Sequence, residues 1–189
     1  MNHRKVLIFI LAFVLFGTFS GIKTKAATSY ITQTTNRYGD LVETQAAYEA
    51  VTKIKSVNTD IGKISFSQPK DLFIDSEDYL YIVDSGNKRV VILDENNEYI
   101  TDFGEGILNQ PRGIYVRDNL IYIADYGLID DNNSGRIFIF TFDKDLKEVN
   151  YLKEFGRPSS IVLEIDNFIY RPEKIAVDAN LTMYIVVEG

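Results

Sequence analysis

The sequence predicts an all-β protein built from repeated units of short antiparallel strands. A similar pattern of apolar segments begins at Pro69, again 42 positions later at Pro111, and a third time at Pro172. The segments are rich in aromatic and β-branched residues, which favour strands. Polar turns of a few residues separate them, and connections this short join antiparallel neighbours. The hydrophobic fraction of 46% is sufficient for a packed core.

The first unit, residues 66–104, contains four predicted strands joined by tight turns. The turn after its second strand has the sequence SGNK. Gly86 in this turn is free to take a positive φ, and the side chain of Asp84 or Asn87 can bond to the turn backbone. The predicted strands of this unit are residues 71–75, 79–84, 89–94 and 99–104.

The second unit, residues 111–156, repeats this order with strands at 113–116, 120–125, 136–143 and 151–156. One aspartate, one glycine and one arginine recur around the turn in both units. Because they recur once per unit, we expect a structural role, in which the aspartate caps its turn and the arginine pairs nearby, rather than a ring of ligand groups. These residues are Asp84, Gly86 and Arg89 in the first unit and Asp125, Gly127 and Arg136 in the second.

The third unit, residues 172–189, contains two predicted strands and has Val187 where the recurring aspartate would stand. Four strands in a repeat of this length are typical of a β-propeller blade. A single sheet of this kind cannot bury both of its faces, so we expect the units to stack face to face. The sequence therefore predicts a partial propeller over residues 47–189, with an outer strand at 47–57 followed by about two and a half blades.

The segment YIVDSGNKRVVILD, residues 81–94, resembles the core of the NHL repeat, and the resemblance extends over residues 66–189. Proteins with this repeat form propellers, commonly of six blades. Together with the N-terminal segment described next, the chain resembles bacterial, Gram-positive-type NHL propellers that are secreted or tethered to the cell surface. Two and a half blades are fewer than a closed ring needs, which indicates a fragment of a longer protein, or a half-ring that dimerises. Exposed blade faces would favour self-association in either case.

The N-terminus has the layout of a secretory signal peptide over residues 1–26. Arg4 and Lys5 precede an apolar run, and Thr24 and Ala26 suit the small positions before a cut after Ala26; a cut after Ala27 is the close alternative. An uncleaved membrane anchor is a further alternative, although the run is short for a span of about 20 residues. We therefore expect an extracellular or cell-surface protein with no membrane span in its mature chain, beginning with an extended polar lead-in over residues 27–46.

Composition excludes several classes of function. The predicted signal holds four basic residues and no acidic ones, so its removal changes the net charge from −7 to −11. A surface this acidic disfavours nucleic-acid binding, including the RNA binding of some NHL propellers. The chain has no cysteine, and its one histidine, His3, lies inside the predicted signal. Disulfides, thiolate ligands and histidine-based catalysis are therefore excluded for the mature chain.

Two loops distinguish the units and are candidate recognition sites, because loops on a rigid scaffold often bind ligands. The longer turn of the second unit, residues 128–135, carries the candidate ligand-binding residues for a cation or a sugar: Asp130, Asp131, Asn132 and Asn133. The crossing at residues 157–171 is unusually apolar and could cover a blade or contact a partner, through Ile161, Val162, Leu163, Ile165 and Phe168.

No cofactor is predicted. The carboxylates of Asp75, Glu77 and Asp78 lie close together in one turn and could hold calcium, but their spacing is not that of a known calcium loop. The function that these observations favour is a non-catalytic extracellular binding or scaffold module for a protein or carbohydrate of the cell envelope. The alternative is a metal-dependent lactonase or lyase of the propeller type, whose site would need further blades.

Cleavage of the signal peptide gives the first testable prediction. When the chain is expressed in a secreting bacterium, the mature protein should begin at Ala27, or at Thr28 for the alternative cut. Mass spectrometry of the secreted protein measures this directly. Recovery of the intact N-terminus in the membrane fraction would contradict the prediction and support the uncleaved anchor.

Overall fold

The structure of the chain is a computed structural model that describes residues 28–29, 33–43, 49–50, 52–159 and 169–188. The described residues form only β-strands and one short 3-10 helix, which confirms the all-β class. The chain divides into two compact units, Met1–Lys53 and Ile54–Gly189, which are described separately. The predicted signal peptide lies outside the described residues.

The first unit contains two small antiparallel pairs. Strand β1 (Thr28–Ser29) pairs with β4 (Glu49–Ala50), and β2 (Gln33–Thr35) pairs with β3 (Leu41–Glu43). The turn between β2 and β3 is stabilised by the Asn36 side chain, which accepts hydrogen bonds from the backbone N–H groups of Tyr38 (2.8 Å) and Asp40 (3.0 Å). This polar segment therefore contains a hairpin where the sequence predicts an unpaired lead-in.

The second unit begins with the hairpin of β5 (Ser56–Thr59) and β6 (Gly62–Ser65). Thr59 pairs directly with Gly62, which has a φ of +136°, so Asp60 and Ile61 form a tight turn. Residues 52–55 belong to no strand. In the described part of the range 47–57, β4 and β5 lie on either side of residues 52–55, so the single outer strand predicted there is not continuous in the structure.

Two four-stranded antiparallel sheets follow, each with its strands in sequence order. The first sheet consists of β7 (Pro69–Ile74), β8 (Leu80–Asp84), β9 (Arg89–Leu93) and β10 (Tyr99–Phe103). The second sheet consists of β11 (Pro111–Arg117), β12 (Leu120–Asp125), β13 (Arg136–Asp143) and β14 (Glu148–Phe155). The hairpin of β15 (Arg171–Val177) and β16 (Met183–Glu188) comes last. The predicted strands of all three repeats are present, with ends shifted by a few residues, but the described residues form no closed ring.

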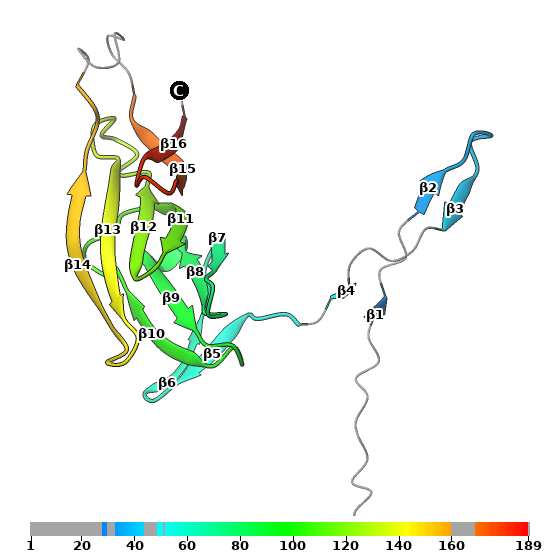
Figure 1. The fold of residues 1–189 in the computed structure, drawn as a ribbon, viewed down its shortest axis with the longest axis horizontal. Coiled ribbons are helices and arrows are strands. Elements are labelled where there is room, and N and C mark those ends of the chain that lie inside the picture. The colour runs from blue at the N-terminus through cyan, green and yellow to red at the C-terminus, as the bar shows by residue number, and fades with distance from the viewer. Residues whose placement is uncertain (1–27, 30–32, 44–48, 51, 160–168, 189) are drawn as a thin grey trace, which may run out of the picture. The chain divides into compact units, whose positions relative to one another are not determined.

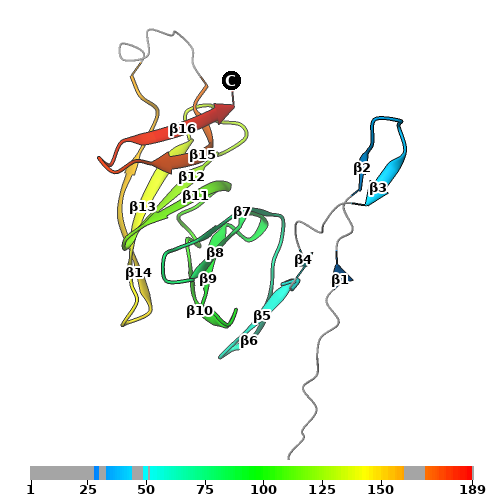
Figure 2. The same cartoon turned by 45° about the vertical axis from the view of Figure 1, so that its right-hand side comes forward.

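Neighbouring sheets pack face to face in the order of the sequence, and Figures 1 and 2 both place the second sheet between the first sheet and the hairpin β15–β16. We call the face that a sheet turns toward the preceding sheet its leading face, and the opposite face its trailing face. Each buried interface joins a trailing face to the next leading face. The largest buries side chains of the first sheet (Tyr81, Val83, Val90, Ile92) against side chains of the second sheet (Ile114, Val116, Ile121, Ile123, Phe138, Phe140, Phe142).

The other two interfaces follow the same rule. On the trailing face of the second sheet, Tyr122 and Ala124 lie in one cluster with Ile175 and Val177 of β15. On the leading face of the first sheet, the hairpin β5–β6 packs through Val57 and Ile64 onto Ile82, Val91 and Leu93. Because each sheet is apolar on both faces, it remains folded only while both faces are covered.

One turn recurs at three places in this unit. An aspartate Oδ1 accepts hydrogen bonds from the backbone N–H groups two and four residues later, and the residue at the third position has a positive φ. Such aspartate turns compete well with regular structure and end a strand sharply. The aspartates are Asp75, Asp94 and Asp178, and the residues with positive φ are Asp78, Asn97 and Leu181.

The close approach of the first strands gives a prediction on stability. A Cβ atom on Gly113 of β11 would lie 2.6 Å from the Glu173 carbonyl oxygen and 2.9 Å from the Lys174 Cα of β15. We expect Gly113→Ala to lower the free energy of unfolding by about 2 kcal/mol, because the two backbones must separate.

Urea denaturation of the full chain measures this loss, with Gly156→Ala as the control. The nearest atoms that a Cβ on Gly156 would meet belong to the guanidinium of Arg136, at 3.4 Å or more. The control should change the free energy of unfolding by less than about 0.5 kcal/mol. Equal effects of the two substitutions would show that β11 and β15 do not lie this close.

Candidate functional site

Asp84, at the end of β8, is fully buried and ties together three segments of the chain. Its Oδ1 accepts a hydrogen bond from the backbone N–H of Ser67 at 2.6 Å, just before β7. Its Oδ2 accepts hydrogen bonds from the Asn87 side chain at 2.7 Å and from Arg89 Nε at 3.0 Å. Arg89 also pairs with Asp102 of β10 at 2.9 Å. These contacts use the acceptor positions of Asp84 inside the fold and leave none directed at solvent.

Asp125 occupies the equivalent position in the second sheet, paired with Pro111 as Asp84 is paired with Pro69. Its carboxylate accepts hydrogen bonds from the backbone N–H groups of Asn109 (2.7 Å), Gln110 (3.1 Å) and Gly127 (2.8 Å). Burial raises the pKa of Asp125 above its ordinary value, against the effect of these three donors. Both aspartates therefore fasten the segment that enters a sheet to the end of the second strand of that sheet.

The glycine and arginine of the turns are less equivalent than the sequence predicts. Gly86 lies in the 3-10 helix Ser85–Asn87, and the positive φ of 55° belongs to Lys88. Glycine is needed at position 86 because a Cβ would lie 2.7 Å from the Ser67 carbonyl oxygen. Arg136 differs from Arg89, since it pairs with Glu154 at 3.6 Å and donates to the carbonyl groups of its own loop.

The predicted ligand residues of the loop 128–135 are used largely to hold that loop. The Asp131 carboxylate accepts from the backbone N–H of Asn133 at 2.9 Å. Asn132 Oδ1 accepts from Arg171 at 2.9 Å, and Asn133 Oδ1 accepts from Arg157 at 3.0 Å. Asp130 is exposed. Three of these four side chains therefore already have hydrogen-bond partners within the protein.

The acidic turn of Asp75, Glu77 and Asp78, considered above for calcium, is contacted by a lysine of the second sheet. Lys144, in the turn between β13 and β14, donates to Asp75 Oδ2 at 3.0 Å and to Glu77 Oε1 at 2.6 Å. Asp75 Oδ2 also accepts from the Tyr81 hydroxyl at 3.0 Å. The ammonium group of Lys144 neutralises the charge that a calcium ion would neutralise. Among the described residues, no group of three or more His, Cys, Asp or Glu side chains is placed to hold a metal ion.

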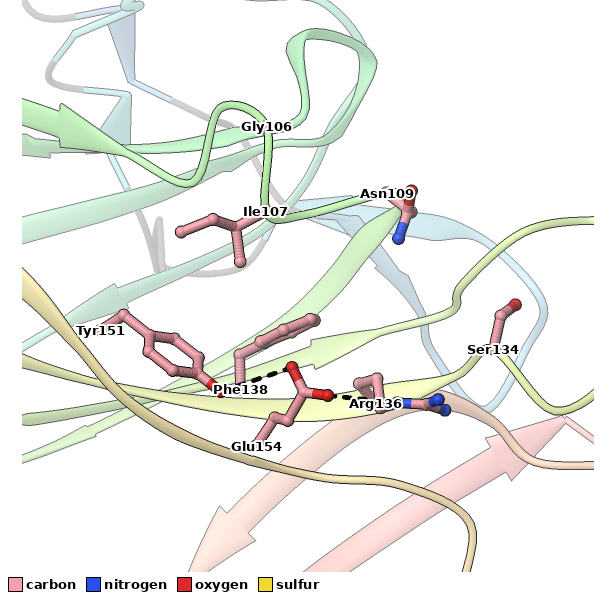
Figure 3. A pocket seen from close by; sticks show the side chains of 8 residues that line it. All are labelled: Gly106, Ile107, Asn109, Ser134, Arg136, Phe138, Tyr151 and Glu154. Atoms are coloured by element: carbon pink, nitrogen blue, oxygen red, sulfur yellow. Dashed lines mark hydrogen bonds and ion pairs between the residues drawn. The ribbon is translucent and has the colours of Figure 1, made fainter.

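A surface cleft of about 440 Å³ is the candidate functional site that sequence reasoning did not find. It lies between the segment 104–110, which joins the two sheets, and strands β13 and β14, as Figure 3 shows. Ile107 points across the cleft toward Tyr151 and Phe138 (Figure 3). The lining residues are Gly106, Ile107, Asn109, Ser134, Arg136, Phe138, Tyr151 and Glu154.

Charged and aromatic groups lie side by side in this cleft. Glu154 accepts from the Tyr151 hydroxyl at 3.5 Å and pairs with Arg136 at 3.6 Å, so the three side chains form one row (Figure 3). Desolvation and the Glu154 carboxylate raise the pKa of Tyr151 further above neutral pH, and a phenol with the ordinary pKa of about 10 is already protonated there. The cleft thus offers hydrogen-bond donors, an acceptor and a half-exposed aromatic ring.

The sequence shows Arg136 as a repeated residue but gives no sign of its partners. Glu154 and Tyr151 follow it by 18 and 15 positions, and they meet it only because β13 pairs with β14 in this register. The apolar residues of the crossing at 157–171, from Ile161 to Phe168, lie outside the described residues, so their predicted covering role stays a prediction.

The chain matches no protein-family model and no curated protein sequence. Within the described residues, no helix is long and apolar enough to span a membrane.

The contact between Lys144 and Asp75 gives a prediction on pH. Burial alone raises the pKa of Asp75, but hydrogen bonds from Lys144, from two backbone N–H groups and from Tyr81 outweigh it and hold this pKa below its ordinary value. The contribution of these contacts to the free energy of unfolding is fully present at pH values above the ordinary pKa of aspartate. It is lost as the pH falls through the pKa that Asp75 has in the folded protein. We expect Lys144→Met to cost about 2 kcal/mol at neutral pH, because Asp75 remains buried without its counter-charge.

Urea denaturation of Lys144→Met and of the unsubstituted chain at several pH values measures how this cost depends on pH. The difference in free energy of unfolding should shrink as the pH falls below the ordinary aspartate pKa. Lys63→Met is the control, because Lys63 is an exposed lysine of β6. A difference that does not vary with pH would show that Lys144 acts through packing and not through charge.

Proposed function

We propose that the second unit is part of a β-propeller related to the NHL repeat. Three features support this proposal: the sheets keep their strands in sequence order, they stack face to face, and their first strands approach most closely, at Gly113. Four-stranded sheets repeated radially in this way are the blades of propellers. The likeness of residues 81–94 to the NHL repeat supports the same assignment.

We further propose that the chain is a non-catalytic binding module of the cell envelope, and that the cleft beside β14 binds a carbohydrate. The observation that carries this proposal is the row of Tyr151, Glu154 and Arg136 at the floor of an open cleft. A sugar presents hydroxyl groups that both donate and accept hydrogen bonds, and it presents an apolar ring face. The cleft offers complementary groups for each of these.

The individual contacts follow from the geometry. Tyr151 is 49% exposed, so its ring is available for packing against a sugar ring. Arg136 is held by the carbonyl groups of Asn133 (2.6 Å) and Gly135 (2.8 Å), which fixes its guanidinium before a ligand arrives. A donor that is already ordered loses less entropy on binding. Asn109 lies across the cleft and adds a side-chain amide.

Binding rather than hydrolysis is favoured by the charges of the cleft. Canonical glycoside hydrolysis uses two carboxyl groups on opposite sides of the bond that breaks. Glu154 is the one carboxylate among the described residues that line the cleft, and it is paired with Arg136. The predicted signal peptide and the acidic mature chain are consistent with a role outside the cell, where sugar polymers of the envelope are accessible.

Carbohydrate binding is testable by calorimetric titration of the full chain with purified cell-wall polysaccharide and with soluble oligosaccharides. We expect Tyr151→Ala to weaken binding by about tenfold, because a stacked aromatic ring contributes about 1 kcal/mol beyond its buried area. The melting temperature should fall only modestly, since the side chain is half exposed and its ring meets Phe140 edge-on at 5.9 Å.

Tyr38→Ala is the matched control, because Tyr38 is an exposed tyrosine of the first unit and is remote in sequence from the cleft. It should leave the affinity unchanged. Absence of binding to every polysaccharide, or equal losses in the two variants, would overturn the proposed function.

A further inference from the structure

The two ends of the sheet stack leave apolar side chains uncovered. On the leading face of the first sheet, Leu72 is 62% exposed and Ile74 is 57% exposed. On the trailing face of the hairpin β15–β16, Tyr184 is 59% exposed and Val186 is 61% exposed. The strand register places Tyr184 and Val186 on the side of the hairpin opposite Ile185, which packs against the second sheet. Apolar patches that are exposed in this way are typical of association surfaces.

These two patches are the two halves of an interface that the chain already contains twice. The strands β7, β11 and β15 can be aligned on Pro69, Pro111 and Pro172. In this alignment Leu72 and Ile74 hold the positions of Ile114 and Val116, and of Ile175 and Val177. By strand register, Tyr184 and Val186 hold the positions of Tyr81 and Val83, and of Tyr122 and Ala124. At the first junction within the chain, Tyr81 and Val83 lie in one cluster with Ile114 and Val116. At the second junction, Tyr122 and Ala124 lie in one cluster with Ile175 and Val177.

The charges at the edge of these faces are also complementary. At the junction of the second sheet with the hairpin β15–β16, the residues directly after the two prolines form an ion pair, Arg112 with Glu173 at 3.4 Å. The corresponding residue of the first sheet is Lys70, which is exposed. If the trailing face of β15–β16 met the leading face of the first sheet, Glu173 would face Lys70, an acidic residue beside a basic one. At the first junction within the chain, the corresponding residues Lys70 and Arg112 are both basic.

The hairpin β5–β6 leaves room for this contact. It packs on the leading face of the first sheet over Ile82, Val91 and Leu93, which belong to β8 and β9. Leu72 and Ile74 on β7 remain open beside it. A second two-stranded element over β7 would complete a layer of four strands on this face.

We propose that this chain associates head to tail with a second copy of itself. The trailing face of β15–β16 in one copy packs on the leading face of β7 in the other, through Tyr184 and Val186 against Leu72 and Ile74. The contact is heterologous, because two different surfaces meet. It repeats between copies the packing that joins neighbouring sheets within one copy.

Complementation between two variants of the full chain tests this proposal. Leu72→Asp places a charge on the leading face only, and Val186→Asp places one on the trailing face only. Each should weaken self-association at least about tenfold, because a charge would be buried in an apolar contact. A mixture of the two variants should form a heterodimer, since each contributes the intact face that the other lacks.

Sedimentation velocity of each variant, of their mixture and of the unsubstituted chain over a range of concentrations gives the result. Leu146→Asp is the control, because Leu146 is a 67% exposed leucine in the turn after β13 and lies on neither face. It should associate as the unsubstituted chain does, and circular dichroism should show that all variants are folded. A monomeric unsubstituted chain, or a mixture that stays monomeric, would overturn the proposal.

Discussion

The structure depends on one constraint, which is that a sheet with two apolar faces must be covered on both. The first and second sheets carry aromatic and aliphatic side chains on their leading and trailing faces alike, and seven aromatic side chains belong to or pack against their shared core. Burial of such surface contributes about 25 cal/mol per Å². Neither sheet would therefore persist alone, and stacking in sequence order is the arrangement that covers each one with the shortest connections.

Polar side chains of the second unit stabilise the stack of sheets. Asp84 and Asp125 anchor the entering segments, so the first strand of each sheet begins at a fixed place beside its predecessor. Lys144 joins the second sheet to the first through Asp75. The cleft arises from the same architecture, because the segment 104–110 must travel from the outer strand of one sheet to the inner strand of the next, across the end of β13.

Local pattern was sufficient to predict the strands of the repeats, because period and turn chemistry are encoded within a few residues. It did not reveal the hairpin β5–β6, whose turn lies at Asp60 and Ile61 within an otherwise continuous polar stretch. Contacts over long separations were also not predictable from local pattern. Asp75 and Lys144 are 69 positions apart, and the sequence left calcium open at a turn where the fold supplies an ammonium group. The cleft depends on the register between β13 and β14. A shift of two residues in this register would move Tyr151 and Glu154 away from their places beside Arg136.

Stacking of sheets in sequence order is the central claim, since the anchoring aspartates, the cleft and the open end faces all follow from it. The most direct measurement is the set of nuclear Overhauser contacts between methyl groups of the full chain. We predict contacts from Val83 and Val90 to Ile114 and Ile123 across the first junction, and from Ile139 to Ile175 and Val177 across the second. Contacts confined to strands of the same sheet would contradict the stacked arrangement.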